Sequence, residues 1–142
     1  MGDVAERAAL RARAEGRTLH ADIAPIDTPV PERDMRRIID NLLDNAIRFS
    51  PEGGDIHLGV AATDHGAAVT VADSCGGVSD EVKSRVFDLG YRADDARNRN
   101  DGGGGLGLAI ARGLAEARGA SLTIDDHDHG CVFALRVPGA LS

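Results

Sequence analysis

Two stretches of this sequence carry residue types and spacings that could do chemistry. Asn41, Asn45 and Arg48 recur every three or four residues inside an apolar helical pattern, so they share one face of a helix. Asparagine is unfavourable inside helices because its side chain competes for backbone hydrogen bonds, so two of them one turn apart need a reason. Residues 101–119 carry a run of glycines that leads directly into a helix N-terminus, where backbone N–H groups bind anions.

Together, the two stretches predict a site for a nucleoside triphosphate with its metal ion. The side chain of Asn45 offers a neutral oxygen, which suits a Mg²⁺ ion that is already bound to phosphates. The guanidinium of Arg48 offers a positive charge to the phosphates themselves. A flexible linker would explain the glycines alone, but a linker does not usually run straight into an amphipathic helix.

Two better-known glycine motifs do not fit. A P-loop needs Lys and then Ser or Thr after its last glycine, whereas Leu108 follows Gly107 here. The dinucleotide pattern G-x-G-x-x-G is formally present, but its glycines must follow a buried strand. Here they follow the polar segment 93–101, which has no strand pattern.

The elements that must position these residues can be read from hydrophobic periodicity and turn residues. The longest helix should begin beside Pro31, and its core face should comprise Met35, Ile38, Ile39, Leu42, Ala46 and Phe49. The helix after the glycines should bury Leu106, Ile110, Leu114 and Ala117. Helices are expected at 4–15, 32–49, 81–88 and 106–118, strands at 17–24, 55–62, 67–73, 120–127 and 130–138, and a loop at 90–104.

Composition limits the class of protein. The 142 residues predict a single domain, 1–142, with a core built from aliphatic residues because aromatics make up 3% of the chain. The net charge of −7 argues against nucleic acid as a partner. No apolar run is long enough for a membrane helix. Two cysteines, Cys75 and Cys131, are too few for a disulfide framework, which favours a reducing, cytoplasmic location.

Four motifs in order, from Asn41 to Leu108, carry a resemblance to a known family. They read NLLDNAIRFS, DSCGGV, VFDLGYR and GGGGLGL. The chain resembles the catalytic, ATP-binding domain of sensor histidine kinases, in the GHKL or Bergerat-fold superfamily that also holds DNA gyrase, Hsp90 and MutL. The resemblance covers essentially the whole chain. It implies a two-layer α/β sandwich, with a mixed sheet packed on three main helices and a flexible ATP lid at about 90–104.

The resemblance also implies roles for individual residues. Asn45 matches the family's Mg²⁺ ligand, Arg48 matches a phosphate contact, and Asp73 matches the carboxylate that accepts a hydrogen bond from the adenine amino group. In the family's pattern, Phe87 matches a conserved motif position and Arg92 a second phosphate contact. The remaining ATP-binding positions implied by the motifs are Asn41, Phe49, Gly77, Val78, Tyr91, Gly103, Gly104, Gly105, Leu106, Gly107 and Leu108.

The identity of Asn41 separates the reactions found in this superfamily. Members that hydrolyse ATP place a Glu there, one helical turn before the Mg²⁺ ligand, to activate water. An amide cannot act as a general base, so phosphotransfer to an acceptor is favoured over hydrolysis. Asn41, Asn45 and Arg48 are therefore the expected catalytic residues.

The acceptor histidine expected by the family is not evident in this sequence. His20 has Pro25 at the family's spacing, but it lies in a predicted strand and lacks the acidic neighbour. A dimerisation and phosphoacceptor domain, separate or removed, is therefore expected as a partner, followed by a response regulator. The isolated domain should be a monomer, and it could be the cytosolic part of a membrane-bound sensor.

Two alternatives stay open. One is a serine kinase of the anti-sigma-factor type, which shares the ATP fold. The other is a degenerate, non-catalytic nucleotide-binding or docking module, because Cys75, Gly90 and Gly104 depart from the family's usual motifs.

Overall fold

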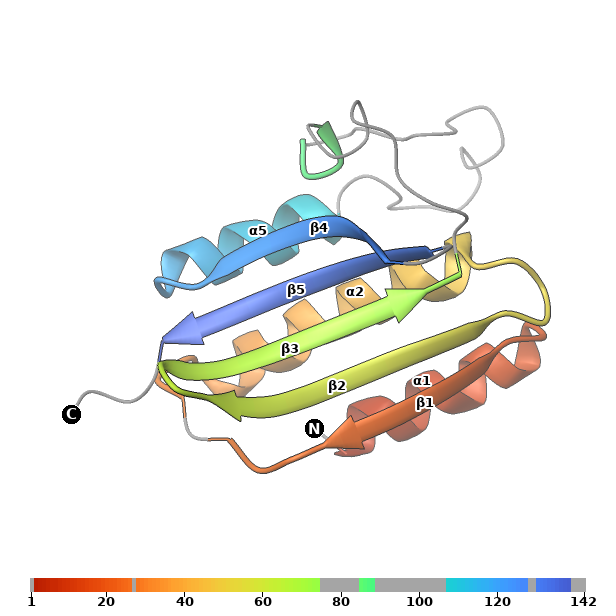
Figure 1. Cartoon of the computed structure of the whole chain (residues 1–142), viewed down its shortest axis with the longest axis horizontal. Helices are drawn as coiled ribbons and strands as arrows, with labels where there is room; N and C mark the ends of the chain where they lie inside the picture. The colour runs from red at the N-terminus through yellow and green to blue at the C-terminus, as the bar shows by residue number, and fades with distance from the viewer. Residues whose placement is uncertain (1, 27, 75–84, 89–106, 128–129, 139–142) are drawn as a thin grey trace.

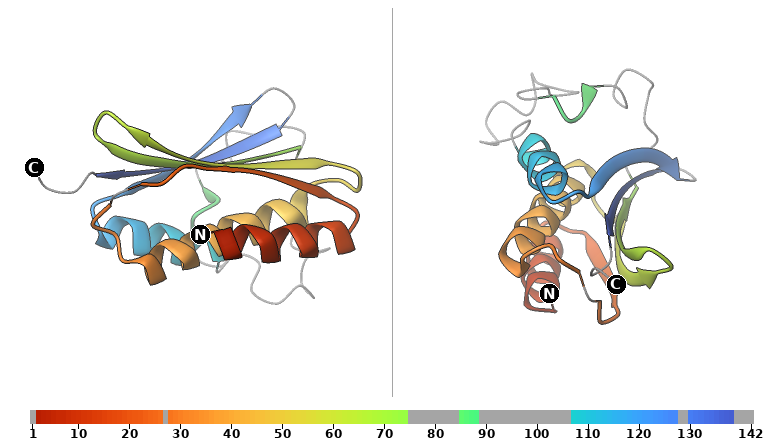
Figure 2. Two further views of the ribbon diagram at one scale, coloured as in Figure 1. Left: turned by 90° about the horizontal axis from the view of Figure 1, so that it is seen from below. Right: turned by 90° about the vertical axis from the view of Figure 1, so that its left-hand side faces the viewer.

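A five-stranded mixed sheet carries helices on one face, as the computed structural model of the chain shows (Figures 1 and 2). The structure describes residues 2–26, 28–74, 85–88, 107–127 and 130–138. Within them, the helices are α1 (Gly2–Ala14), α2 (Glu32–Phe49) and α5 (Gly107–Ala117). The strands are β1 (Thr18–Ile23), β2 (Asp55–Thr63), β3 (Gly66–Asp73), β4 (Ser121–His127) and β5 (Gly130–Pro138). The predicted two-layer α/β sandwich is confirmed.

The strand order is β1-β2-β3-β5-β4. The first two strands are parallel, because α2 carries the chain from the end of β1 back to the start of β2. All other neighbours are antiparallel, and β2 and β3 form a hairpin in which Thr63 pairs with Gly66. The predicted ends of the described elements match the observed ones to within two residues, and those of 32–49 and 130–138 coincide with them. The predicted loop 90–104 and most of the predicted helix 81–88 lie outside the described residues.

Helix α2 is the central helix of the helical layer, and its sequence explains its orientation. Pro31 precedes its first residue, where a fixed φ is compatible with helix entry. Five of the six predicted core residues are buried, and Leu43 and Ile47 join them. The exception is Phe49, which is 37% exposed at the last position of the helix. That part of the prediction is wrong, because the buried face continues from Ala46 to Ser50, which is 2% exposed, and Phe49 lies beside it.

Helix α5 buries a different stripe from the predicted one. Leu108, Ala111 and Ala115 are buried, Leu114 is partly buried, and Ile110 is 36% exposed. Ala117 is also exposed, and Leu106 lies outside the described residues. The helix is apolar on several sides, so periodicity could not select the stripe that meets α2 and β4. Small alanines face the neighbours because they permit close approach of the helices.

Candidate active site

The polar face of α2 meets the beginning of α5. Asn41 is partly buried on α2, and a Cβ atom added to Gly107 would lie 3.5 Å from the Asn41 side-chain oxygen. The glycine that opens α5 therefore lies against this asparagine, although 66 positions separate the two residues in the sequence. The structure thus brings together one residue from each of the two stretches that the sequence singles out.

The side-chain nitrogen of Asn41 is buried and has no hydrogen-bond partner among the residues that the structure describes. A buried amide donor without a partner costs on the order of 1–3 kcal/mol, so native proteins rarely leave one without a purpose. Asn45, one turn further along α2, is also partly buried. This face of α2 therefore presents an amide donor, that of Asn41, for which the described residues supply no acceptor.

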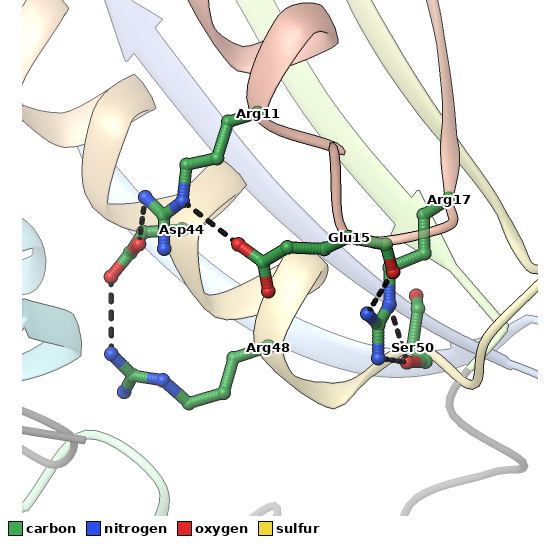
Figure 3. Close-up of polar contacts among 6 residues, drawn as sticks. All are labelled: Arg11, Glu15, Arg17, Asp44, Arg48 and Ser50. Carbon is green, nitrogen blue, oxygen red and sulfur yellow. Dashed lines mark hydrogen bonds and ion pairs between the residues drawn. The ribbon is translucent and has the colours of Figure 1, made fainter. Parts of the chain in front are cut away.

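Arg48 completes the polar face in the last turn of α2, where a cation also complements the helix dipole. Its side chain is 16% exposed, and its Nη2 lies 3.4 Å from Oδ2 of Asp44 (Figure 3). Asp44 also forms an ion pair with Arg11 of α1. Sequence reasoning missed Asp44 and Arg11. The four-residue spacing of Asp44 and Arg48 was the available signal, whereas the contact with α1 is purely tertiary.

The C-terminus of α2 is held from the other side by Arg17, at the entry to β1. Its Nε and Nη2 both donate to the carbonyl oxygen of Ser50, at 2.9 and 2.6 Å (Figure 3). That carbonyl belongs to the residue that caps the helix and would otherwise lack a helical donor. The turn of α2 that carries Arg48 is thus anchored to the neighbouring strand.

Asp73 is the last residue of β3 and is 7% exposed. In Figures 1 and 2, this end of β3 lies at the same end of the molecule as the C-terminal half of α2. Asp73 is one of two polar or charged residues that are buried in the described part of the chain; the other is Ser50. Burying a carboxylate is costly unless hydrogen bonds offset the lost hydration.

Gly130 at the start of β5 lies directly against the backbone of Asp73. A Cβ atom added there would overlap the Asp73 carbonyl oxygen, which belongs to the backbone and cannot turn away. We expect Gly130→Ala to displace the end of β3 and to lower the free energy of unfolding by about 1–3 kcal/mol. Urea denaturation followed by circular dichroism measures this loss.

The matched control for this substitution is Gly113→Ala. A Cβ atom on Gly113, exposed within α5, meets nothing within 4 Å, so alanine should be neutral or slightly stabilising there. Equal stability of the two variants would contradict the overlap at Asp73.

Phe87 anchors the segment that precedes the predicted lid. Its ring packs edge-on against Phe133 of β5, with ring centroids 5.9 Å apart. The guanidinium of Arg112 from α5 lies 5.2 Å above the same ring. The aromatic residue of the third motif therefore joins β5 to α5.

The remaining predicted site residues fall into two groups, those that the structure describes and those outside the described ranges. Leu108 is 6% exposed in the first turn of α5, and Phe49 is exposed at the end of α2. The following predicted residues lie outside the described ones: Gly77, Val78, Tyr91, Arg92, Gly103, Gly104, Gly105 and Leu106.

Cys131 is disulfide-bonded, a bond that the sequence analysis does not predict. Cys131 pairs with Asp73 across β5 and β3. Cys75, the other cysteine in the sequence, follows Asp73 by two residues and lies outside the described part. No helix within the described ranges is long and apolar enough to cross a membrane.

His20 lies in β1, as predicted. Its Nε2 lies 3.0 Å from Oδ1 of Asp55, and its ring stacks on His57. It is thus part of a strand pair at the sheet edge and not of a helix.

The two-layer sandwich places the polar face of α2 beside the start of α5, and comparison with known proteins identifies the family. Residues 31–141 match the family described as "Histidine kinase-, DNA gyrase B-, and HSP90-like ATPase". The chain belongs to this family. The resemblance read from the four motifs is therefore confirmed, and ATP is the substrate that the family implies.

Known relatives and solved structures are sensor kinases. The sensor histidine kinase Hik2 of Thermosynechococcus vestitus is 37% identical over 133 residues, covering 90% of this chain and 34% of Hik2. The mycobacterial sensor histidine kinase MprB superposes with a TM-score of 0.80 at 26% identity, over 100% of this chain and 97% of the solved one. Full-length ShkA, solved with AMPPNP, gives a TM-score of 0.79 at 29% identity, over 99% of this chain and 29% of ShkA. The chain thus spans about a third of the length of its relative Hik2.

Proposed function

We propose that this chain is the catalytic part of a histidine kinase. It binds Mg·ATP between the polar face of α2 and the N-terminal end of α5. It then passes the γ-phosphoryl group to a histidine of a phosphoacceptor domain, from which the group moves to an aspartate of a response regulator. The sensor histidine kinases among its relatives support histidine over serine as the acceptor, and ShkA was solved with an ATP analogue.

The observation that carries the proposal is the buried, unpartnered side-chain nitrogen of Asn41 beside the first residue of α5. A bound triphosphate would bring oxygens that accept from this donor. The same oxygens would meet the backbone N–H groups of the first turn of α5, which have no acceptor within the helix. One ligand would then satisfy groups on two elements that the chain brings together.

The donor set of α2 fits a magnesium ion that arrives with the phosphates. Mg²⁺ is usually held by one or two protein oxygens, by water and by substrate phosphates. Within the residues that the structure describes, no three His, Cys, Asp or Glu side chains could hold a metal ion alone. Asn45 would supply the protein oxygen, and Arg48 would neutralise phosphate charge. The ion, when bound, offsets charge that develops on the transferred group.

Asp73 would select the base. A buried carboxylate accepts a hydrogen bond from the amino group of adenine, whereas guanine carries a carbonyl oxygen at the equivalent position. That oxygen would face the carboxylate with two acceptors opposed and no shared proton. ATP should therefore bind in preference to GTP.

Transfer to an external nucleophile is consistent with the acid–base groups on α2. Asn41 cannot take a proton from water, and both oxygens of Asp44 are held by arginines. In the transfer, the bond between the γ-phosphorus and the bridging oxygen breaks, and ADP leaves. A bond forms from an imidazole nitrogen of the acceptor to phosphorus, and the imidazole loses its proton. The chain's contribution is positioning and charge neutralisation.

The remaining assignments belong to the same proposal. Residues of about 90–104 would form the ATP lid, and 1–142 would form one catalytic domain. The nucleotide would also be contacted by Gly77, Val78, Tyr91, Arg92 and residues 103–108. Phe49 would lie beside it. The isolated domain would be a monomer. In the whole protein, it would be the cytosolic part of a sensor.

Nucleotide titration of Asp73→Asn tests the proposed site. We expect Mg·ATP affinity, measured by calorimetry, to fall about ten- to a hundred-fold, because the amide presents a donor to the adenine amino group. The preference for Mg·ATP over Mg·GTP should shrink as well. Asp22→Asn, an exposed carboxylate on β1, is the matched control and should bind as the unaltered chain does.

Two results would overturn the proposal. One is no binding of Mg·ATP by the unaltered chain at millimolar concentration. The other is an Asp73→Asn variant that is folded and still prefers ATP as strongly as before. Transfer of radioactive phosphate from ATP to a supplied histidine-bearing phosphoacceptor domain then tests the second half of the reaction.

A further inference from the structure

Asp44 lies between two arginines that come from different helices. Its Oδ1 pairs with Nη1 of Arg11 on α1, and its Oδ2 lies 3.4 Å from Nη2 of Arg48 on α2 (Figure 3). Each carboxylate oxygen therefore has its own guanidinium. Asp44 is 35% exposed and Arg48 16% exposed, so the pair nearer the proposed phosphate site is the less hydrated one.

Arg11 is held in place by acidic neighbours. Its Nε lies 3.4 Å from Oε2 of Glu15, one turn further along the chain. Partial burial lowers the pKa of Arg11, but Asp44 and Glu15 outweigh that effect and leave the pKa above its ordinary value. Arg11 thus stays charged, and its charge is directed at Asp44.

The carboxylate of Asp44 presents an electrostatic problem for a phosphate site. Asp44 immediately precedes Asn45, so its negative charge would oppose an incoming triphosphate. Asp44 and Arg48 alone would form a pair with no net charge. With Arg11 present, each oxygen of the Asp44 carboxylate has its own guanidinium, so the negative charge of Asp44 opposes an incoming triphosphate less strongly.

We propose that Arg11 is a positioning residue for phosphate binding: it neutralises Asp44, so that this carboxylate does not repel the phosphates of ATP. The inference rests on the proposed function. Arg11 belongs to a helix that supplies none of the proposed nucleotide ligands, so α1 is coupled to the phosphate site through charge. A shift of α1 against α2 would therefore change the affinity for ATP.

A purely structural role is the competing explanation, because ion pairs also hold α1 to α2. Arg7 and Asp40, 3.9 Å apart, form such a pair one turn earlier on both helices. Arg7, Arg11, Asp40 and Asp44 line the same cleft of about 340 Å³ between the helices. Arg7 is thus a matched control: it is an arginine of α1 paired with an aspartate of α2, but its partner does not contact Arg48 among the contacts described.

The test compares Mg·ATP affinity in Arg11→Met, Arg7→Met and Arg11→Met/Asp44→Asn, each made in the full chain. We expect Arg11→Met to weaken binding about three- to ten-fold at low salt, because Asp44 is then opposed by Arg48 alone. Arg7→Met should bind within about two-fold of the unaltered chain. The double variant should recover affinity to within about two-fold, because the opposing carboxylate is gone.

Rescue distinguishes charge from structure. If Arg11 only clamps α1 to α2, the double variant lacks the clamp and stays weak, which overturns the proposal. Equal losses in Arg11→Met and Arg7→Met would overturn it too, as would a loss unchanged at about 1 M salt. Failure of the proposed function gives a different result, since the unaltered chain would then not bind Mg·ATP at all.

Discussion

Asn45→Ala is expected to reduce phosphotransfer about a hundred-fold or more. The proposed magnesium ion would lose its protein oxygen, and the charge developing on the transferred phosphoryl group would be less well offset. Transfer of phosphate from ATP to a supplied phosphoacceptor domain, measured over a range of Mg²⁺ concentrations, gives the effect. The loss should be largest at low Mg²⁺ and should shrink as Mg²⁺ is raised.

The fold should survive this substitution, because alanine favours a helix more than asparagine does. Arg33→Ala, exposed in the first turn of the same helix, is the control and should transfer phosphate at the unaltered rate. An Asn45→Ala variant with normal transfer and a normal dependence on Mg²⁺ would remove Asn45 from the metal site. The proposed amide ligand would then have to be sought elsewhere on α2.

Phe133→Ala is expected to lower the free energy of unfolding by about 3–5 kcal/mol. The ring of Phe133 on β5 is 1% exposed and packs against Phe87, so its removal leaves a cavity between the sheet and the helical layer. A loss of this size is a large part of the stability of a domain, which is about 5–15 kcal/mol in total. Urea denaturation at constant pH measures it.

Leu10→Ala provides the comparison, because Leu10 is a large apolar residue of α1 that is 64% exposed. Its substitution should change the free energy of unfolding by less than about 0.5 kcal/mol. If both variants lost the same stability, the assignment of Phe133 to the centre of the core would be wrong.

The elements of the fold follow closely from local sequence. In β2 and β3, apolar residues alternate with polar ones, and in α2 they recur every three or four residues, because one side of each element faces the core. Each pattern involves residues close together in the sequence, so the element bounds could be predicted to within one or two residues. The four motifs then identified the family, because their order and spacing are unusual in combination.

The buried faces of helices and the contacts between residues far apart in the sequence were harder to predict. The stripe of α5 that is buried, including Ala111 and Ala115, could not be chosen from a helix that is apolar on several sides. The exposure of Phe49 depends on which residue of the last turn of α2 the neighbouring elements cover, and they cover Ser50. Both are properties of the packed arrangement, and no local pattern encodes them.

By itself, the sequence determined the class of protein and the residues of α2 that the proposed site uses, because asparagines within an apolar helix are conspicuous. Tertiary structure alone decided that Gly107 lies against Asn41, that Cys131 pairs with Asp73 across the sheet, and that Arg11 reaches Asp44. The physical reason is the same in each case. Interactions within one helix or strand are set by spacing along the chain, whereas interactions between elements exist only after burial of the core has brought those elements together.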